Sequence, residues 1–193
     1  MNGKTDDEGA VIETQRLILR RPRPLDAAAL ALLANNPRVV ENTGRLPYPY
    51  GETDARQWIA RVVADREARF VIALRPPDGD LVGAIGFDRL EDGDSPDLGY
   101  WLGVSHWGRG YATEAARAVI DFAFDTYGFE RLAAGCRITN AASRRVLEKC
   151  GFQYCGDSMM ESRYFGGIVP VRRFRLDRGI WLSLKQWGKS PPA

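Results

Sequence analysis

Two glycines stand one residue apart just before a segment with helical spacing, in the stretch His106-Trp-Gly-Arg-Gly-Tyr-Ala-Thr-Glu-Ala115. Glycines at the start of a helix let backbone N–H groups point outward at its positive end, where they can bind a phosphate group. A tight turn without any ligand is the alternative that these residues alone leave open. The chemistry in question is therefore the binding of a phosphorylated ligand.

Two other phosphate-binding motifs fit this stretch poorly. A P-loop has Lys and then Ser or Thr after its glycines, whereas Tyr111 follows Gly110. A dinucleotide-binding motif requires a further Gly or Ala where Thr113 stands and an acid after the next strand, but Glu130 precedes that strand. The remaining interpretation is a set of amides at a helix terminus.

Covalent catalysis by cysteine is a different chemistry, and the sequence does not favour it. The chain has three cysteines, Cys136, Cys150 and Cys155, and no C-x-x-C pair, which fits neither a disulfide framework nor a zinc site. A Cys–His pair would depend entirely on His106, the single histidine. We expect reduced thiols, with Cys136 and Cys150 buried, in a cytoplasmic protein that binds no metal.

The composition is typical of one globular domain. Of the 193 residues 45% are apolar and 27% are charged. A net charge of +2 gives no overall field to recruit nucleic acid or an anionic membrane, and the dense arginine clusters are expected to be solvated. No segment approaches the about 20 apolar residues of a membrane span. We expect no nucleic-acid partner and no membrane partner.

Hydrophobic spacing and turn residues predict strands and helices in alternation. Strands are expected at 16–20, 70–74, 81–87, 98–104 and 132–138, from Phe152 onward, and over about 159–164 and 171–184. Helices are expected at 25–35, about 53–67, 112–127 and 141–150, with a turn at 91–96. The long aromatic loop 38–52 is of a kind that often lines a pocket.

This order predicts a mixed α/β (α+β) fold in a single domain. We expect a sheet of about seven strands, antiparallel in its first half and partly parallel in its second, flanked by about four helices. The segments 1–13 and 187–193 are polar and expected to be flexible, so that the domain covers residues 14–186.

Three motifs in this chain resemble those of the GNAT acyltransferase superfamily. The stretch from Trp107 resembles its acetyl-CoA pyrophosphate loop, a Leu-Gly-Tyr-Trp-Leu strand precedes it at 98–102, and Asn-x-x-Ser-x-x-x-Leu-x-Lys-x-Gly-Phe follows at 140–152. Their order is most similar to the branch of ribosomal-protein N-terminal acetyltransferases, over about residues 13–184. The resemblance implies a GNAT-like fold and an acetyl-CoA-dependent N-acetyltransferase.

The resemblance also implies which residues hold acetyl-CoA. Backbone groups at the end of one strand would pair with the pantetheine arm, with Gly103 at a bulge, and loop amides would bind the pyrophosphate. These residues are Trp101, Leu102, Gly103 and Val104 for pantetheine, and Gly108, Arg109, Gly110, Tyr111, Ala112 and Thr113 for pyrophosphate. Asn140 would bond a pantetheine amide and Ser143 the thioester sulfur. By residue type alone, Asn140 is also a favoured helix N-cap and Ser143 an ordinary surface serine.

The resemblance does not supply a catalytic base. Another branch of the superfamily has a Glu before the Asn and a Tyr after it, where this chain has Gly135 and Leu147. The remaining candidates, in the order that we favour them, are a water relay, Asp97 beside the pantetheine strand and His106 beside the loop.

We therefore expect direct acetyl transfer to a primary amine, with the cofactor between strands 98–104 and 132–138. The acceptor is a peptide N-terminus, which the resemblance favours, or a small molecule, in a pocket covered by Tyr48 and Tyr50. A non-catalytic acyl-CoA-binding module is the alternative, because the acid and base of the other branch are missing. The edge strand of the final hairpin could support a homodimer.

Overall fold

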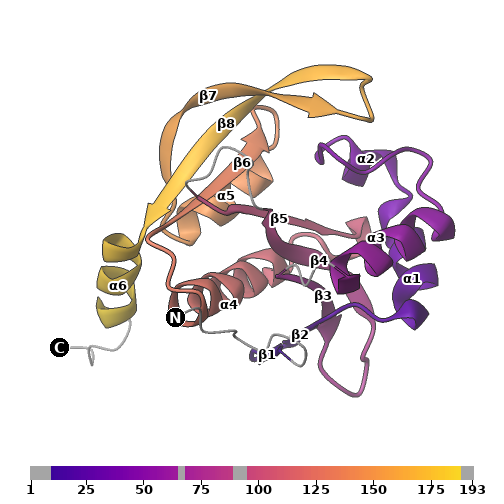
Figure 1. Cartoon of the computed structure of the whole chain (residues 1–193), viewed down its shortest axis with the longest axis horizontal. Coiled ribbons are helices and arrows are strands. Elements are labelled where there is room, and N and C mark those ends of the chain that lie inside the picture. Colours follow the sequence, from indigo (N-terminus) through magenta and orange to yellow (C-terminus); the bar gives the residue numbers. More distant parts are fainter. Residues whose placement is uncertain (1–9, 65–67, 89–94, 188–193) are drawn as a thin grey trace.

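The computed structural model describes residues 10–64, 68–88 and 95–187. A single mixed sheet contains eight strands in the order β1-β2-β3-β4-β5-β6-β8-β7 (Figure 1). Neighbouring strands are antiparallel except for β5 and β6, which run parallel. The strands are β1 Val11–Glu13, β2 Leu17–Arg20, β3 Arg69–Leu74, β4 Leu81–Asp88, β5 Asp97–Leu102, β6 Arg131–Arg137, β7 Gln153–Ser162 and β8 Gly167–Asp177.

Six α-helices flank this sheet in the described part of the chain. They are α1 Ala27–Ala34, α2 Pro37–Val40, α3 Glu52–Ala64, α4 Tyr111–Thr126, α5 Ala141–Lys149 and α6 Arg178–Trp187. Two short 3-10 helices, η2 Pro24–Asp26 and η3 Val104–His106, precede α1 and follow β5. The mixed α/β architecture is confirmed, with one strand and two α-helices more than the sequence predicted. None of the described helices is long and apolar enough to cross a membrane.

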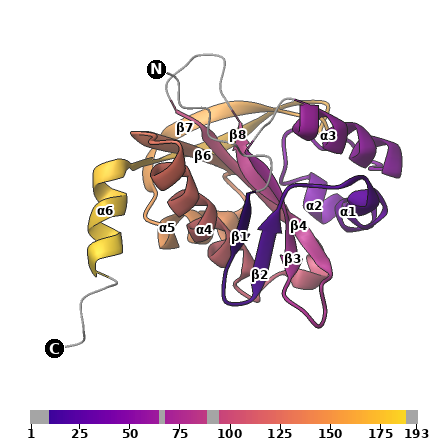
Figure 2. The same cartoon turned by 60° about the horizontal axis from the view of Figure 1, so that its bottom comes forward.

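Alternation along β3 shows how the two faces of the sheet are covered. Phe70 and Ile72 lie in the main core together with Val119 and other residues of α4. Val71 points to the other face, into a second cluster formed with α1 and α3. Helix α4 and the pair α1 and α3 accordingly lie on opposite sides of the sheet (Figure 2).

The C-terminal strand predicted at 171–184 is wrong beyond residue 177, where helix α6 begins. Trp181 is buried, stacks on Phe124 of α4 with 4.9 Å between ring centroids, and donates from Nε1 to Asp121 Oδ1 at 2.6 Å. The strands predicted from Phe152 and at 159–164 are one continuous strand, β7. Since β8 lies between β6 and β7, these two do not pair directly.

The N-terminal boundary also differs from the prediction. Residues 11–13, assigned to a flexible segment, form the edge strand β1, in which Val11 pairs with Arg20 and Glu13 with Ile18. Three residues are too few for an alternating pattern to be visible in the sequence. The predicted turn 91–96, the last residues of the helix predicted to reach 67, and the segments 1–9 and 188–193 lie wholly or partly outside the described residues.

The bulge predicted at Gly103 is not observed. The register between β4 and β5 is continuous from Asp88↔Asp97 to Gly83↔Leu102, and β5 ends there. Gly103 packs closely on α1 instead, since a Cβ at this position would lie 2.5 Å from Cδ2 of Leu33. A larger residue here would therefore force the Leu33 side chain to shift, and glycine lets the strand end pack closely on α1.

Candidate active site

Strands β5 and β6 begin side by side and then separate. Their parallel pairing consists of Asp97↔Ala133 and Leu98↔Ala134. Beyond these pairs, β4 still pairs with β5 as far as Leu102, and β8 pairs with β6 as far as Arg137. The facing edges of β5 and β6 thus carry backbone groups without a strand partner, and such an edge can pair with an extended ligand.

Tyr100 and Ser143 meet at this gap. Strand alternation puts Tyr100 on the same face of β5 as Leu98 and Leu102, which are both in the core. The Tyr100 hydroxyl lies 2.9 Å from Ser143 Oγ and donates to the Ser143 carbonyl at 3.3 Å. Burial raises the pKa of Tyr100, so the phenol keeps its proton at neutral pH. The sequence interpretation missed Tyr100, although the alternation over 98–102 could have placed it on this face.

Asn140 is the N-cap of α5, as its residue type predicted. Its Oδ1 accepts a hydrogen bond from the Ser143 amide at 3.0 Å. Its Nδ2 has no partner among the described residues and so remains available as a donor. Asn140 also lines a pocket of about 510 Å³ with Glu41, Asn42, Arg137, Thr139, Ala141 and Ala142. The same side chain can therefore cap the helix and face a ligand.

The glycine loop presents unpaired amides at the start of α4. Gly108 and Gly110 have φ angles of 72° and 81°, which other residue types rarely adopt. Gly110 is the N-cap, no side chain caps the helix, and the first amide bonded within it is that of Glu114, to Gly110 O at 3.1 Å. Among the described residues, the amides of 108–113 have no acceptor. They fit an anion such as a pyrophosphate.

All four backbone positions predicted for pantetheine, 101–104, take part in internal hydrogen bonds. Trp107 Nε1 donates to the Leu102 carbonyl at 2.8 Å, and the Gly103 amide donates to Val82 O at 2.9 Å. Val104 begins the 3-10 helix η3. Trp101 and Leu102 both lie within β5. Since the Gly103 amide bonds β4, alternation places the backbone groups of Trp101 on the β4 side and those of Tyr100 and Leu102 on the side of the gap, where a ligand strand would pair.

Asp97 lies at the closed end of the gap and is held in an ion pair. Both of its carboxylate oxygens accept hydrogen bonds from Arg173 of β8, at 3.0 and 3.2 Å. Arg173 reaches Asp97 across Gly135, where a Cβ would lie 2.8 Å from its Nη1. Both Asp97 oxygens are thus already engaged by one guanidinium, and a substrate amine would have to compete with Arg173 for them.

His106 and the buried thiols are not charged at neutral pH. Burial and the positive charge of Arg109 lower the pKa of His106, and its Nδ1 has no partner among the described residues. Cys136 and Cys150 are buried as predicted, and burial raises the pKa of Cys150 to about 11. Protonated thiols are weak nucleophiles, which agrees with a mechanism without a cysteine intermediate.

The aromatic loop contributes different residues to the pocket than the sequence indicated. Tyr50 is only 4% exposed and belongs to the cluster under α1, where its amide donates to Asn35 Oδ1 at 3.1 Å. Tyr48 is half-exposed and packs edge-on against Tyr164, near the turn between β7 and β8. Neither tyrosine lines the pocket, whereas Glu41 and Asn42 from the start of this loop do.

The long hairpin of β7 and β8 supports residues of this pocket from outside it. Figure 1 shows it reaching across to the region of α2. The Arg163 amide donates to Gly44 O at 3.0 Å, and the Phe165 ring lies over the Arg137 guanidinium, 4.6 Å from its carbon. Arg137 in turn donates from Nη1 to Glu41 O at 3.0 Å. The pocket is therefore lined by two segments that are distant in sequence, 41–42 and 137–142.

Comparisons with known proteins agree with this architecture. The acetyltransferase (GNAT) domain family matches residues 16–153. The uncharacterized N-acetyltransferase p20 of Bacillus licheniformis is 28% identical over 84% of this chain and 93% of its own length. The ribosomal-protein-serine acetyltransferase of Escherichia coli is 33% identical over 39% of this chain and 42% of its own length. The structure of Mycobacterium smegmatis RimJ with CoA-disulfide has a TM-score of 0.78 at 23% identity, covering 95% of this chain and 97% of that one.

Proposed function

The chain belongs to the GNAT acetyltransferase family, and from this premise we propose that it acetylates the N-terminal amine of a peptide or protein. Membership makes it an acetyl-CoA-dependent N-acetyltransferase. The proposal concerns the acceptor and the residues that take part in the transfer.

The pocket beside the β5–β6 gap is the observation that carries this choice of acceptor. Small-molecule sites are mostly apolar and enclosed, whereas this pocket is lined by polar residues such as Asn42, Thr139 and Asn140. A peptide terminus brings backbone amides that such groups can bond, and Glu41 supplies negative charge for its ammonium group. The partial similarity to an enzyme named for a ribosomal protein supports the same class of acceptor.

The candidate cofactor-binding residues follow one another in the same order as the parts of acetyl-CoA, from the pyrophosphate to the thioester. The amides of 108–113 would hold the pyrophosphate with the charge of Arg109, the free edge of β5 at Tyr100 would pair with the pantetheine arm, and Asn140 Nδ2 would bond one of its carbonyl groups. When bound, acetyl-CoA supplies the activated acetyl thioester. Ser143 would then lie at the inner end of this series, beside the gap.

Ser143 and Tyr100 form a proton-donating pair in this proposal. Ser143 Oγ can give its proton to the departing thiolate of coenzyme A while the neutral Tyr100 hydroxyl, 2.9 Å away, holds it in place by a hydrogen bond. The proton that pocket water takes from the amine then returns to Ser143. Asp97 is bound by Arg173 and His106 belongs to the segment beside the glycine loop. We therefore keep water in the open pocket as the group that first accepts the proton of the amine, ahead of Asp97 and His106.

Acetyl transfer to a set of matched peptides tests the proposal. Each peptide is offered with a free and with a chemically blocked N-terminus, and small primary amines are assayed in parallel by thiol release from acetyl-CoA. We expect turnover with free peptide termini, mass spectra that locate the acetyl group on the terminal amine, and no turnover with blocked peptides. Turnover with small amines alone would overturn the peptide assignment while leaving the enzyme class intact.

A further inference from the structure

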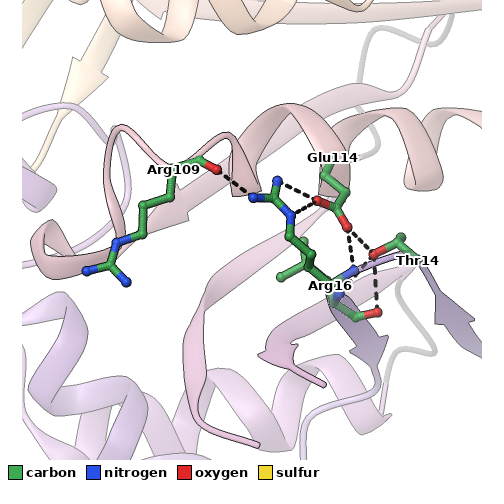
Figure 3. A network of polar contacts seen from close by, with 5 residues as sticks. Thr14, Arg16, Arg109 and Glu114 are labelled. Atoms are coloured by element: carbon green, nitrogen blue, oxygen red, sulfur yellow. Dashed lines mark hydrogen bonds and ion pairs between the residues drawn. The ribbon is translucent and has the colours of Figure 1, made fainter. Parts of the chain in front are cut away.

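Arg16, just before β2, links the N-terminal segment to the glycine loop (Figure 3). Its guanidinium donates from Nη1 to the Arg109 carbonyl at 2.9 Å and from Nε to Glu114 Oε2 at 2.7 Å. Its backbone amide and the Thr14 hydroxyl donate to the other Glu114 oxygen, at 2.8 and 2.7 Å. The guanidinium carbon also lies 4.8 Å from the centre of the Tyr111 ring. One side chain thus contacts the loop and the first turn of α4 together.

The bond to the Arg109 carbonyl fixes the direction of the next amide. The carbonyl of Arg109 and the N–H of Gly110 belong to one trans peptide unit, in which they point in opposite directions. Because Arg16 holds the oxygen, the N–H of Gly110 points away from Arg16. The Arg109 side chain also extends away from this network (Figure 3). Arg16 therefore lies behind the loop at this point, on the side opposite to the Gly110 amide.

We propose that Arg16 is a positioning residue for the pyrophosphate of the coenzyme: it orients the loop amides from behind and does not itself touch the phosphates. This inference rests on the proposed pyrophosphate site. Gly110 makes the arrangement possible, since a Cβ on it would lie 3.3 Å from Arg16 Nη2, tighter than an ordinary contact.

Glu114 gives Arg16 a second, electrostatic role. Burial alone would raise the pKa of Glu114, but the hydrogen bonds from Thr14 and Arg16 outweigh it and lower the pKa, so this carboxylate is ionised at neutral pH. A free carboxylate in the first turn of α4 would repel a pyrophosphate and compete for the helix amides. Arg16 neutralises this charge and holds it behind the loop, so both of its contacts favour binding of the anion.

Two ligands, one with phosphates and one without, distinguish a role of Arg16 in positioning the loop amides from a role in the general stability of the fold. We would measure the Kd of CoA by calorimetry, and kcat/KM with S-acetylpantetheine, which carries the thioester but no phosphate. Loss of a charge-assisted bond and of the neutralising charge in Arg16→Ala should weaken CoA binding about 30-fold. With S-acetylpantetheine, kcat/KM should change less than about twofold, because the loop amides are not used.

Two further variants make the comparison specific. Arg16→Lys keeps a cation, but an ammonium group cannot contact both Glu114 and the Arg109 carbonyl as a guanidinium does. Its Kd for CoA should therefore lie between those of wild type and Arg16→Ala. Arg131→Ala is the matched control, because Arg131 is similarly exposed and pairs with Asp177 at 2.6 Å, where β6 begins and β8 ends. We expect its CoA affinity to equal that of wild type.

The possible results distinguish a failure of the positioning role of Arg16 from a failure of the proposed pyrophosphate site. CoA binding by Arg16→Ala within about twofold of wild type, or an equal loss with S-acetylpantetheine, would overturn the positioning role. If Arg16→Ala does not fold, the same two measurements, the Kd of CoA and kcat/KM with S-acetylpantetheine, are made on Arg16→Lys to test the positioning role. Failure of the wild-type protein to bind CoA would instead overturn the proposed pyrophosphate site itself.

Discussion

The pair of Tyr100 and Ser143 can be tested with a double-mutant cycle. The variants are Tyr100→Phe, Ser143→Ala and the combination of both. If Ser143 Oγ gives up a proton during acetyl transfer and Tyr100 acts only through Ser143, the losses in kcat caused by the two substitutions must not add. Once Ser143 Oγ is removed, the Tyr100 hydroxyl has no remaining side-chain partner at the gap.

The expected magnitudes follow from the contacts. Loss of a positioned proton donor lowers turnover by about 100-fold, so Ser143→Ala should raise the barrier by about 2.7 kcal/mol. Tyr100→Phe leaves Ser143 in place and removes its 2.9 Å partner, for which we expect about 10-fold, or about 1.4 kcal/mol. The double variant should match Ser143→Ala alone, about 100-fold below wild type rather than about 1000-fold.

The assay is thiol release at saturating acetyl-CoA and acceptor, with unfolding by urea as a check on folding. Removal of one hydroxyl from this pair should lower the unfolding free energy by about 1 kcal/mol. Tyr154→Phe is the control, because Tyr154 is an exposed tyrosine of β7 that packs on Phe174. Additive losses in kcat, or an unchanged kcat for Ser143→Ala, would refute the proton-donating pair.

Three further predictions follow from individual side chains. Asn140→Ala should lose its cap and about 1 kcal/mol of unfolding free energy, whereas Asn140→Asp should keep the cap; both should bind acetyl-CoA more weakly by calorimetry. Gly110→Ala should raise the Kd of CoA about 10-fold or more through strain at φ 81°, while Gly79→Ala, at φ 65° in open space, should leave it unchanged. Because the folded state lowers the pKa of His106, the unfolded chain binds its proton more tightly, so stability should fall as the pH drops below about 6.5. His106→Gln should flatten that change in urea midpoint between about pH 7.5 and about pH 6.

The parts of the site that could be predicted from the sequence are local in the chain. The glycines before α4 show the start of that helix because few residues adopt their backbone angles, and Asn140 caps α5 through a neighbour three residues away. Spacing within one element is visible in a single sequence. The start of α4 and the N-cap of α5 were therefore found within a residue.

Contacts between distant segments could not be read from the same patterns. Arg16 and Glu114 are 98 positions apart, a separation that gives no periodic signal, so the ion pair behind the glycine loop went unnoticed. Tyr50 was assigned to the pocket because it lies in a long loop, but the bond of its amide to Asn35 draws it into the core. The apolar residues after Asp177 fit a strand by type, and only packing of Trp181 on α4 makes them a helix.

The absence of a carboxylate at position 135 has a structural reason in this chain. Gly135 pairs with Arg173 across β6 and β8, and the Arg173 side chain passes over it to reach Asp97 on β5. This ion pair links β5 and β8 at the end of the gap where β5 and β6 still pair. A side chain at 135 would place its Cβ 2.8 Å from Arg173 Nη1, so the guanidinium would have to shift. A glutamate there would also compete with Asp97 for Arg173, whereas glycine leaves the ion pair of Asp97 and Arg173 undisturbed.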